Sequence, residues 1–354
     1  MTPDGYFIKD MVVLGDPSTY VSKGAFVFSP DLHNSSDETL IKWKDQLRNI
    51  LRSIGTRSRM QIHFTKNHNF LGELNNYALD TEKNDHNPYS SYYRDAIYRE
   101  YMEDLQNRNL TKYVCRLYLC KQIDSPRPFG LSAKKLISYL DGVLDEYNRE
   151  FLQTFGIMNQ IFGSSGGKLI AMMDLDHFDD YTEFLNPSFS ERERFEHRKH
   201  FDPMLSIHQQ CLRSGIQGGN KNKPPFGFYQ DSYYHNMLIL KRTPKATVPG
   251  IIHKITSLDL IDYRITMNVY PLDADSEKIS HQSTIDKLKK AHASTGAEEL
   301  DTSIGIKKTK VRKLLGGYQP YHFDYVFRAW ERTPAELAGT TEKIRQAIHH
   351  MRDA

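Results

Sequence analysis

Residues 321–337 read YHFDYVFRAWERTPAEL, and this stretch joins an extended segment to the start of a helix. Aromatic side chains alternate with polar ones along its first half, which is the period of a half-buried β-strand. Thr333 and Glu336 then have the spacing of a helix capping box, and Pro334 stands at the first helical position. The stretch therefore predicts a strand followed by a final helix that runs to about Met351.

The chain before this stretch predicts another strand and a helical excursion. Apolar and polar residues alternate over 261–269, and two segments at about 274–294 and 297–315 have helical character. Strand, helical excursion, strand and helix make up half of a ferredoxin-like α+β arrangement. We therefore expect residues 227–354 to form an α+β region that carries a long helical hairpin.

The N-terminal part of the chain has the same mixed character. Alternation in residues 60–65 and 110–121 predicts strands, and apolar positions at helical spacing over 40–54 predict a helix that opens with a capping box of Ser35 and Glu38. A polar, tyrosine-rich segment follows the first of these strands and is expected to be helical in its second half. Tyrosine has an apolar body and a polar tip, which suits contact faces.

The middle of the chain is expected to be helical. Residues 131–162 and 169–185 both space their apolar side chains as helices do, so the glycine-rich turn between them is expected to join two helices. Breaker residues at 125–130 and 218–225 bound this part. The sequence thus predicts an N-terminal α+β region over 1–125, a helical bridge and linker over 126–226, and a second α+β region over 227–354.

Composition is that of an ordinary globular protein, with 39% hydrophobic and 26% charged residues among 354. The formal net charge of +3 is small for this length, so DNA binding is not expected. Three cysteines are no disulfide framework and indicate a reducing compartment. There is no apolar run of membrane-spanning length and no signal-peptide core, so we expect a cytoplasmic protein without a transmembrane segment.

Asp174 and Asp176, in the run MMDLDHF, are the candidates for metal chemistry. On a strand the two carboxylates would share a face and could hold Mg²⁺ on a triphosphate, as in nucleotidyl-transfer enzymes. On a helix they diverge by about 200° and the pair is lost. Helical spacing continues to Leu185, so a helix is expected, and a Mg²⁺-dependent nucleotidyl enzyme is the alternative that a strand here would favour.

A glycine-rich segment and a basic run have some features of binding motifs. The segment FGSSGGKL, residues 162–169, lacks the first glycine of a phosphate-binding loop and the hydroxyl that should follow its lysine. No catalytic, cofactor or metal site is expected from the sequence. A dense basic run, expected at a solvated helical tip or against an acidic partner, consists of Lys307, Lys308, Lys310, Arg312 and Lys313.

Several short phrases resemble one known family. Trp330–Leu337 matches a W-x-x-T-x-x-E-L phrase that opens a helix, and Leu314–Gly317, with the sequence LLGG, precedes the aromatic strand as it does in that family. Phe184–Pro187 is similar to the family's LNP segment, and Asp4–Phe7 is similar to its opening. The chain resembles the N-terminal region of the conjugative-transfer and type IV secretion ATPases of the TraC/TrbE/CagE type.

The resemblance implies a docking region rather than an enzyme. Family members normally continue into a RecA-like motor with Walker A and B sequences, and this sequence contains neither. The resemblance therefore assigns ATP binding to no residue here. The motor is expected in cis or in trans. The chain is then a fragment, a split gene product or a motor-less paralogue. Its implied partners are inner-membrane secretion-channel proteins and further copies of itself, at the cytoplasmic face of that membrane.

The expected partner contacts are the basic run at 307–313 together with Arg328 and Trp330. Core packing is the alternative for Trp330, because it adjoins a predicted strand. A DNA-processing accessory protein is a further alternative, and it requires the basic run to lie on a continuous positive surface whose binding weakens steeply with salt.

Overall fold

The computed structural model describes residues 5–15, 20–28, 36–55, 58–67, 74, 77–79, 82–83, 87–107, 109–123, 133–164, 166–189, 196–218, 227–240, 258 and 262–352. The chain forms two compact units, each built from separated segments. Unit 1 consists of Met1–Asp31, Gln61–Met267 and Asp324–Ala354, and unit 2 of Leu32–Met60 and Asn268–Phe323. The predicted boundary after residue 125 lies outside the described residues, as does residue 226, and both positions belong to unit 1.

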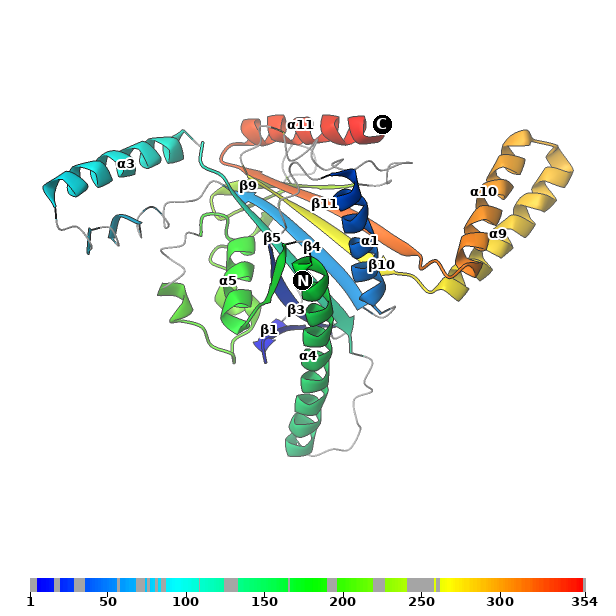
Figure 1. The fold of residues 1–354 in the computed structure, drawn as a ribbon, viewed down its shortest axis with the longest axis horizontal. Helices are drawn as coiled ribbons and strands as arrows, with labels where there is room; N and C mark the ends of the chain where they lie inside the picture. Colours follow the sequence, from blue (N-terminus) through cyan, green and yellow to red (C-terminus); the bar gives the residue numbers. More distant parts are fainter. Residues whose placement is uncertain are drawn as a thin grey trace. The chain divides into compact units, whose positions relative to one another are not determined.

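The protein is mixed α and β, with an open sheet (Figure 1). In the described part of the chain the strand order is β1-β2-β3-β5-β4-β10-β11-β9-β8-β7, and β6 pairs with β3 outside this path. The strands are β1 (Gly5–Ile8), β2 (Met11–Leu14), β3 (Tyr20–Phe28), β4 (Ser58–Asn67), β5 (Lys112–Gln122), β6 (Lys168–Ala171), β7 (Gln217–Gly218), β8 (Phe228–Gln230), β9 (Tyr233–Ile239), β10 (Tyr263–Pro271) and β11 (Tyr321–Glu331). Strands β4, β10 and β11 contribute residues to both units.

The helices follow the sequence prediction closely in most places. They are α1 (Asp37–Ser53), α3 (Pro88–Gln106), α4 (Ala133–Gly163), α5 (Asp174–Leu185), α7 (Ile207–Cys211), α9 (Ala274–Thr295), α10 (Glu298–Leu315) and α11 (Pro334–Arg352). The prediction of a mixed α and β protein is confirmed. The order of the strands in the sheet does not confirm a ferredoxin-like arrangement. None of the helices that the structure describes combines the length and the apolar character needed to cross a membrane.

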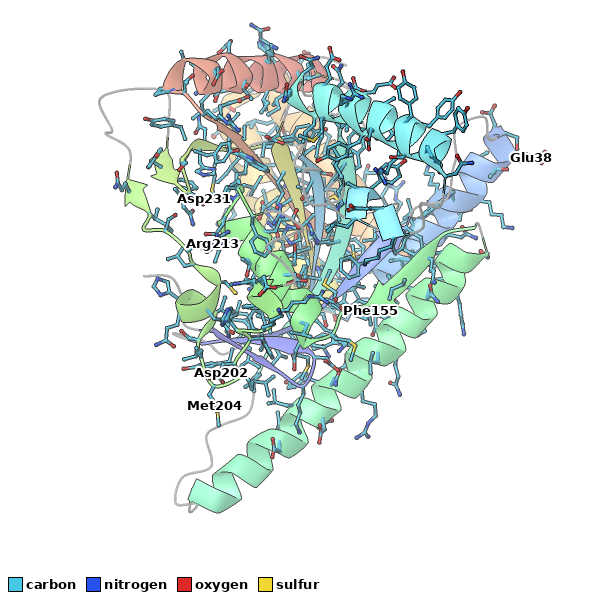
Figure 2. All side chains as sticks on the ribbon, turned by 90° about the vertical axis from the view of Figure 1, so that its left-hand side faces the viewer. Glu38, Phe155, Asp202, Met204, Arg213 and Asp231 are labelled. Carbon is cyan, nitrogen blue, oxygen red and sulfur yellow. The ribbon has the colours of Figure 1, made fainter. Side chains whose placement is uncertain are left out.

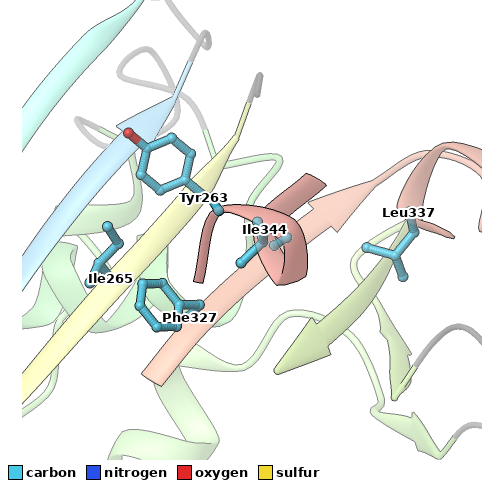
Figure 3. Close-up of a cluster of buried hydrophobic side chains, with 7 residues drawn as sticks. Tyr263, Ile265, Phe327, Leu337 and Ile344 are labelled. Carbon is cyan, nitrogen blue, oxygen red and sulfur yellow. The ribbon is translucent and has the colours of Figure 1, made fainter. Parts of the chain in front are cut away.

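One face of the unit 1 sheet is apolar and carries α11. Successive residues of a strand point to opposite faces, so β10 and β11 each present one apolar row. Figure 3 shows this core, a cluster that Tyr263, Ile265 and Phe327 form with Ile344 and Leu337 of α11. Each of these side chains is at most 4% exposed. Full burial of a large apolar side chain stabilises the fold by about 1.5–3 kcal/mol, so this cluster holds α11 on the sheet.

The N-terminal strands are covered by α4, α5 and α7. Helix α4 packs on β3 and β6, and its buried Phe155 is labelled in Figure 2. Helices α5 and α7 pack on β1, where a second apolar cluster includes Phe7, Phe178 and Ile207. The ring of Phe7 meets that of Phe178 edge to face at 6.1 Å. These contacts fix α5 over the start of the sheet, and α5 supplies the charged side chains described below.

The predicted helix over 169–185 is wrong in its first part. Residues Lys168–Ala171 form β6, in which Leu169 pairs with Val27 of β3, and α5 begins only at Asp174. Strand β2 pairs with β3 only as far as Ser22, so the edge beyond it is open for β6. This pairing partner is remote in sequence and overrides the local helical spacing. The glycine-rich turn joins a helix to a strand, which is the reverse of the order in a phosphate-binding loop.

Unit 2 contains α1 and the α9–α10 hairpin. Helix α1 is capped by Ser36, whose Oγ accepts from the Thr39 backbone N at 3.3 Å, so the cap lies one residue later than predicted; Ser35 itself lies outside the described residues. The hairpin has the predicted bounds to within a residue or two, and its turn contains Gly296 with a positive φ of 63°. Ile285 and Ile304 are the buried side chains of the hairpin.

Candidate functional site

A row of buried arginines crosses the face of the unit 1 sheet opposite α11. Arg116 of β5, Arg264 of β10 and Arg328 of β11 are each 4–5% exposed. Arg264 and Arg328 alternate with the apolar residues of the core under α11, so the strand pleat directs them to the other face. Burying a guanidinium is costly unless it is paired, so the partners of these three side chains decide what the row does.

Helix α5 supplies two carboxylates to this row. Arg116 Nη2 donates to Glu183 Oε2 at 2.6 Å, and its Nε lies 2.8 Å from Asp180 Oδ1. Arg264 Nη2 lies 4.0 Å from the same Asp180 oxygen, and Arg264 Nε donates to Thr65 Oγ1 at 2.9 Å. Asp180 thus lies between two arginines from different strands, and it ties α5 to β5 and β10.

Tyr118 completes this cluster. Its hydroxyl donates to Asp180 Oδ2, and its ring meets that of His177 at 5.7 Å between centroids. Burial raises the pKa of Tyr118 well above its usual value, and the neighbouring carboxylate of Asp180 raises it further, so the hydroxyl remains protonated and donates. Burial alone would raise the pKa of Asp180, but Arg116 and Arg264 hold it below its ordinary value. Asp180 is therefore ionised and paired.

Arg328 is surrounded by aromatic rings. Unlike Arg116, it forms no ion pair with a carboxylate among the residues that the structure describes. Its Nη1 donates to the Phe184 backbone O at 2.6 Å, and its guanidinium carbon lies 4.8 Å from the centre of the Phe184 ring and 5.7 Å from that of Trp330. Its Nη2 lies 3.4 Å from His235 Nδ1. Burial lowers the pKa of Arg328 below its ordinary value, and repulsion from the Arg264 charge lowers it further.

The structure corrects the expected role of Arg328 and Trp330 as partner contacts. They are 5% and 7% exposed, so neither presents a surface to a partner in the folded chain. For Trp330 the alternative of core packing is confirmed. For Arg328 the reason lies in α5 and β9, whose aromatic rings, carbonyl group and imidazole surround the guanidinium. Contacts between residues so far apart in the chain leave no local signal in the sequence.

Asp174 and Asp176 lie in the first turn of α5, as the helical prediction requires. The Asp174 backbone N donates to Asp10 Oδ1 at 3.0 Å, and Asp176 Oδ2 accepts from the Met173 backbone N at 3.0 Å. Asp176 thereby satisfies a free N–H group at the helix start, where negative charge is favourable. The strand geometry needed for a shared Mg²⁺ is not present. Within the described residues no three His, Cys, Asp or Glu side chains are grouped so as to hold a metal ion.

The basic run lies in the C-terminal half of α10 and reaches the last turn of that helix. The turn between α9 and α10 is at residues 296–297, whereas α10 continues through the run to Leu315. Lys307 is partly covered and its Nζ lies 3.4 Å from His281 Nδ1 of α9. Lys308, Lys310, Arg312 and Lys313 are exposed, and none forms an ion pair within the described residues.

Helix α3 is a second exposed surface, and no partner-contact residue was predicted on it. None of its residues is buried, and Tyr89, Tyr92 and Tyr93 are 79%, 70% and 68% exposed. The sequence did carry a signal for this surface, because tyrosine is concentrated in the segment and tyrosine suits contact faces. The prediction of a helix in the second half of this segment is confirmed.

The chain matches no model of a known protein family, and no curated protein matches its sequence.

Proposed function

We propose that this chain is a non-catalytic docking region of a conjugation or type IV secretion ATPase. In this role it binds inner-membrane secretion-channel proteins and further copies of itself at the cytoplasmic face of the membrane. The phrases Trp330–Leu337, Leu314–Gly317 and Phe184–Pro187, which resemble that family, support the proposal. In this role the chain does not hydrolyse ATP, and a separate motor domain performs that reaction.

The observation that carries the proposal is the order of elements in the last third of the chain. Strand β10, the hairpin α9–α10, the aromatic strand β11 and the helix α11 follow one another as the resemblance implies for this family. The W-x-x-T-x-x-E-L phrase lies across the end of β11 and the start of α11, where the resemblance expects a helix to open.

The distribution of charge also favours docking over catalysis. The carboxylates and arginines that are close enough for chemistry, such as Asp180 with Arg116, are buried and paired with each other. Helix α10 carries exposed positive charge, and α3 carries exposed aromatic rings. Surfaces of this kind are typical of protein interaction sites.

The first experiment captures partners from detergent-solubilised inner membranes of cells that carry a conjugation machine. The purified chain is cross-linked, and the captured proteins are identified by mass spectrometry. Retrieval of channel subunits, reduced by charge reversal of Lys308 and Arg312, is the expected result. Retrieval of no channel subunit by the folded chain contradicts the proposal.

Titration with Mg²⁺-ATP and Mg²⁺-GTP, with turnover followed in the same samples, completes the test. We expect neither saturable binding nor hydrolysis. Binding that is lost in Asp174→Ala or Asp176→Ala would instead favour a nucleotidyl-transfer enzyme. Binding to duplex DNA that weakens steeply with salt would favour a DNA-processing accessory protein.

A further inference from the structure

Helix α3 (cyan in Figure 1) is rich in tyrosine, a residue that suits contact faces, yet it buries none of its residues. Helices of this length gain most of their stability from packing one face, and intrinsic propensity adds little. Three tyrosine side chains, Tyr89, Tyr92 and Tyr93, are more than two-thirds exposed at its N-terminal end. A contiguous exposed aromatic surface of this kind marks an interaction site.

The exposed face of α3 is aromatic at one end and acidic at the other. At 3.6 residues per turn, Tyr89, Tyr93, Ile97 and Glu100 lie on one side of the helix, and Glu103 flanks them. Glu100 and Glu103 are exposed, and neither has an ion-pair partner within the described residues. The partner that fits this face is therefore a helix that is apolar at one end and basic at the other.

In the same chain, the C-terminal half of α10 carries an exposed isoleucine followed by basic residues. On α10, Ile306, Lys310 and Lys313 follow one another at intervals of four and three residues, and Ile306 is 55% exposed. Ile306 and Lys313 are seven residues apart, which is also the separation of Tyr93 and Glu100 on α3. When Ile306 is aligned with Tyr93 in parallel packing, Lys313 lies opposite Glu100, and Lys310 and Glu103 each lie within one helical turn of this charged pair.

We propose that the α3 face of one copy packs on the α10 face of a second copy. The inference rests on the proposed function, for which it names one self-association contact. Because the two faces differ, the contact is head-to-tail, and each copy keeps one free face of each kind for the next. Repetition then produces a closed ring or an open filament. A contact between two single helices is small, so assembly depends on protein concentration and is weakened by salt.

Charge reversal on either face tests the contact in the full chain. The first variant carries Glu100→Lys and Glu103→Lys, and the second carries Lys310→Glu and Lys313→Glu. Each alone places like charges on both faces, and we expect its self-association constant, measured by sedimentation velocity, to fall by about tenfold or more. In an equimolar mixture each reversed face meets its complement, so association returns to the wild-type range.

A matched control carries Lys287→Glu and Lys289→Glu on the exposed side of α9. It changes net charge as the second variant does and leaves α10 intact, so its association should equal that of the wild type. Circular dichroism of every variant verifies that the helices are retained. A wild-type chain that stays monomeric at every concentration overturns the proposal. So does a single variant that associates like the wild type, or a mixture that does not recover.

The outcomes separate this contact from the proposed function. If the chain is monomeric but still retrieves channel subunits, the self-association contact is wrong and the docking function stands. If the charge-reversal pattern appears but no channel subunit is retrieved, the contact stands and the docking function is wrong. Retrieval that persists in both charge-reversed variants places channel binding on a different surface.

Discussion

At Gly24 the space for a side chain is already occupied. A Cβ at this position of β3 would lie 2.6 Å from Met172 Sδ and 2.9 Å from both His177 Cε1 and Tyr118 Cε1. These neighbours are buried among α5 and β5, so they have little room to move. We predict that Gly24→Ala lowers the free energy of unfolding by about 1–3 kcal/mol, measured by urea denaturation.

The same substitution at Gly142 is the control. Gly142 lies in α4, and a Cβ there meets nothing within 4 Å. Alanine is favoured over glycine in a helix by about 1 kcal/mol, so Gly142→Ala should raise the free energy of unfolding. If Gly24→Ala and Gly142→Ala changed the free energy of unfolding in the same direction, the close approach at Gly24 would be contradicted.

Asp180 is the residue on which the buried charges depend. Its carboxylate lies 2.8 Å from Arg116 Nε and 4.0 Å from Arg264 Nη2. Asp180→Asn keeps the shape of the side chain and removes its charge, which leaves two buried guanidinium groups with less compensation. Removing one partner of a buried pair costs about 3–5 kcal/mol, and we predict a loss of that size in urea denaturation.

An exposed ion pair provides the comparison. Asp145 lies 2.8 Å from Lys9 Nζ, and its side chain is 57% exposed. Exposed pairs contribute less than about 1 kcal/mol, so Asp145→Asn should have a small effect. If Asp180→Asn were no more destabilising than Asp145→Asn, the cluster around Asp180 would not hold α5 to the sheet.

At the scale of elements, the start of α11 is stabilised by a local capping box. Thr333 Oγ1 accepts from the Glu336 backbone N at 3.3 Å, and the Thr333 backbone N donates to Glu336 Oε2 at 3.1 Å, so the predicted capping box is confirmed. Thr333→Ala removes one acceptor from the helix start. We predict a loss of about 1 kcal/mol, measured by thermal or urea unfolding.

Thr309 in the interior of α10 serves as the control for this substitution. Its hydroxyl donates to the Gly305 backbone O, which already has its helical partner, and the side chain is exposed. Threonine is a poorer helix former than alanine, so Thr309→Ala should leave stability unchanged or raise it slightly. A larger loss at Thr309 than at Thr333 would contradict the role of the cap.

Elements with local signals could be predicted from the sequence, and their surroundings could not. The bounds of α9, α10 and α11 follow from helical spacing and from a cap that involves neighbouring residues. Strand β6 was missed because its reason is the open edge of β3, more than a hundred residues earlier in the chain. Local spacing carries no information about such an edge.

The candidate site shows the same limit for single side chains. The alternation in β11 correctly places Phe327 and Ala329 on one face of the sheet and Arg328 and Trp330 on the other. It does not predict which residues cover the face of Arg328 and Trp330. A charged side chain opposite an apolar core usually faces water. Here Phe184 lies over the Arg328 guanidinium and buries it, and that contact spans 144 positions of sequence.

At the scale of the whole molecule, the charged face of the sheet connects segments that are far apart in the chain. Arg116 comes from β5, Arg264 from β10 and Asp180 from α5, so the cluster forms only when these parts of unit 1 fold together. We infer that unit 1 unfolds as one cooperative unit, because loss of any one of these elements exposes the charges of the others. The same face also holds buried histidines, which link this cooperativity to pH.

His177 and His235 are fully buried. Burial lowers the pKa of His177 to about 4 and that of His235 to about 3. In the unfolded chain a histidine has a pKa near 6.5, so below that pH the unfolded state binds protons that the folded state does not. The stabilising contribution of the neutral histidines is complete above pH 6.5 and is lost as the pH falls toward 4.

We therefore predict that the free energy of unfolding falls between pH 6.5 and 4, by up to about 1.4 kcal/mol per pH unit for each histidine. Urea midpoints measured in steps of half a pH unit provide the test. His177→Gln removes one titrating group and should flatten the slope even though it lowers stability at neutral pH. Equal stability at pH 7 and pH 5 would mean that these imidazoles accept protons in the folded chain, and the arginine row would then have to tolerate two more buried positive charges.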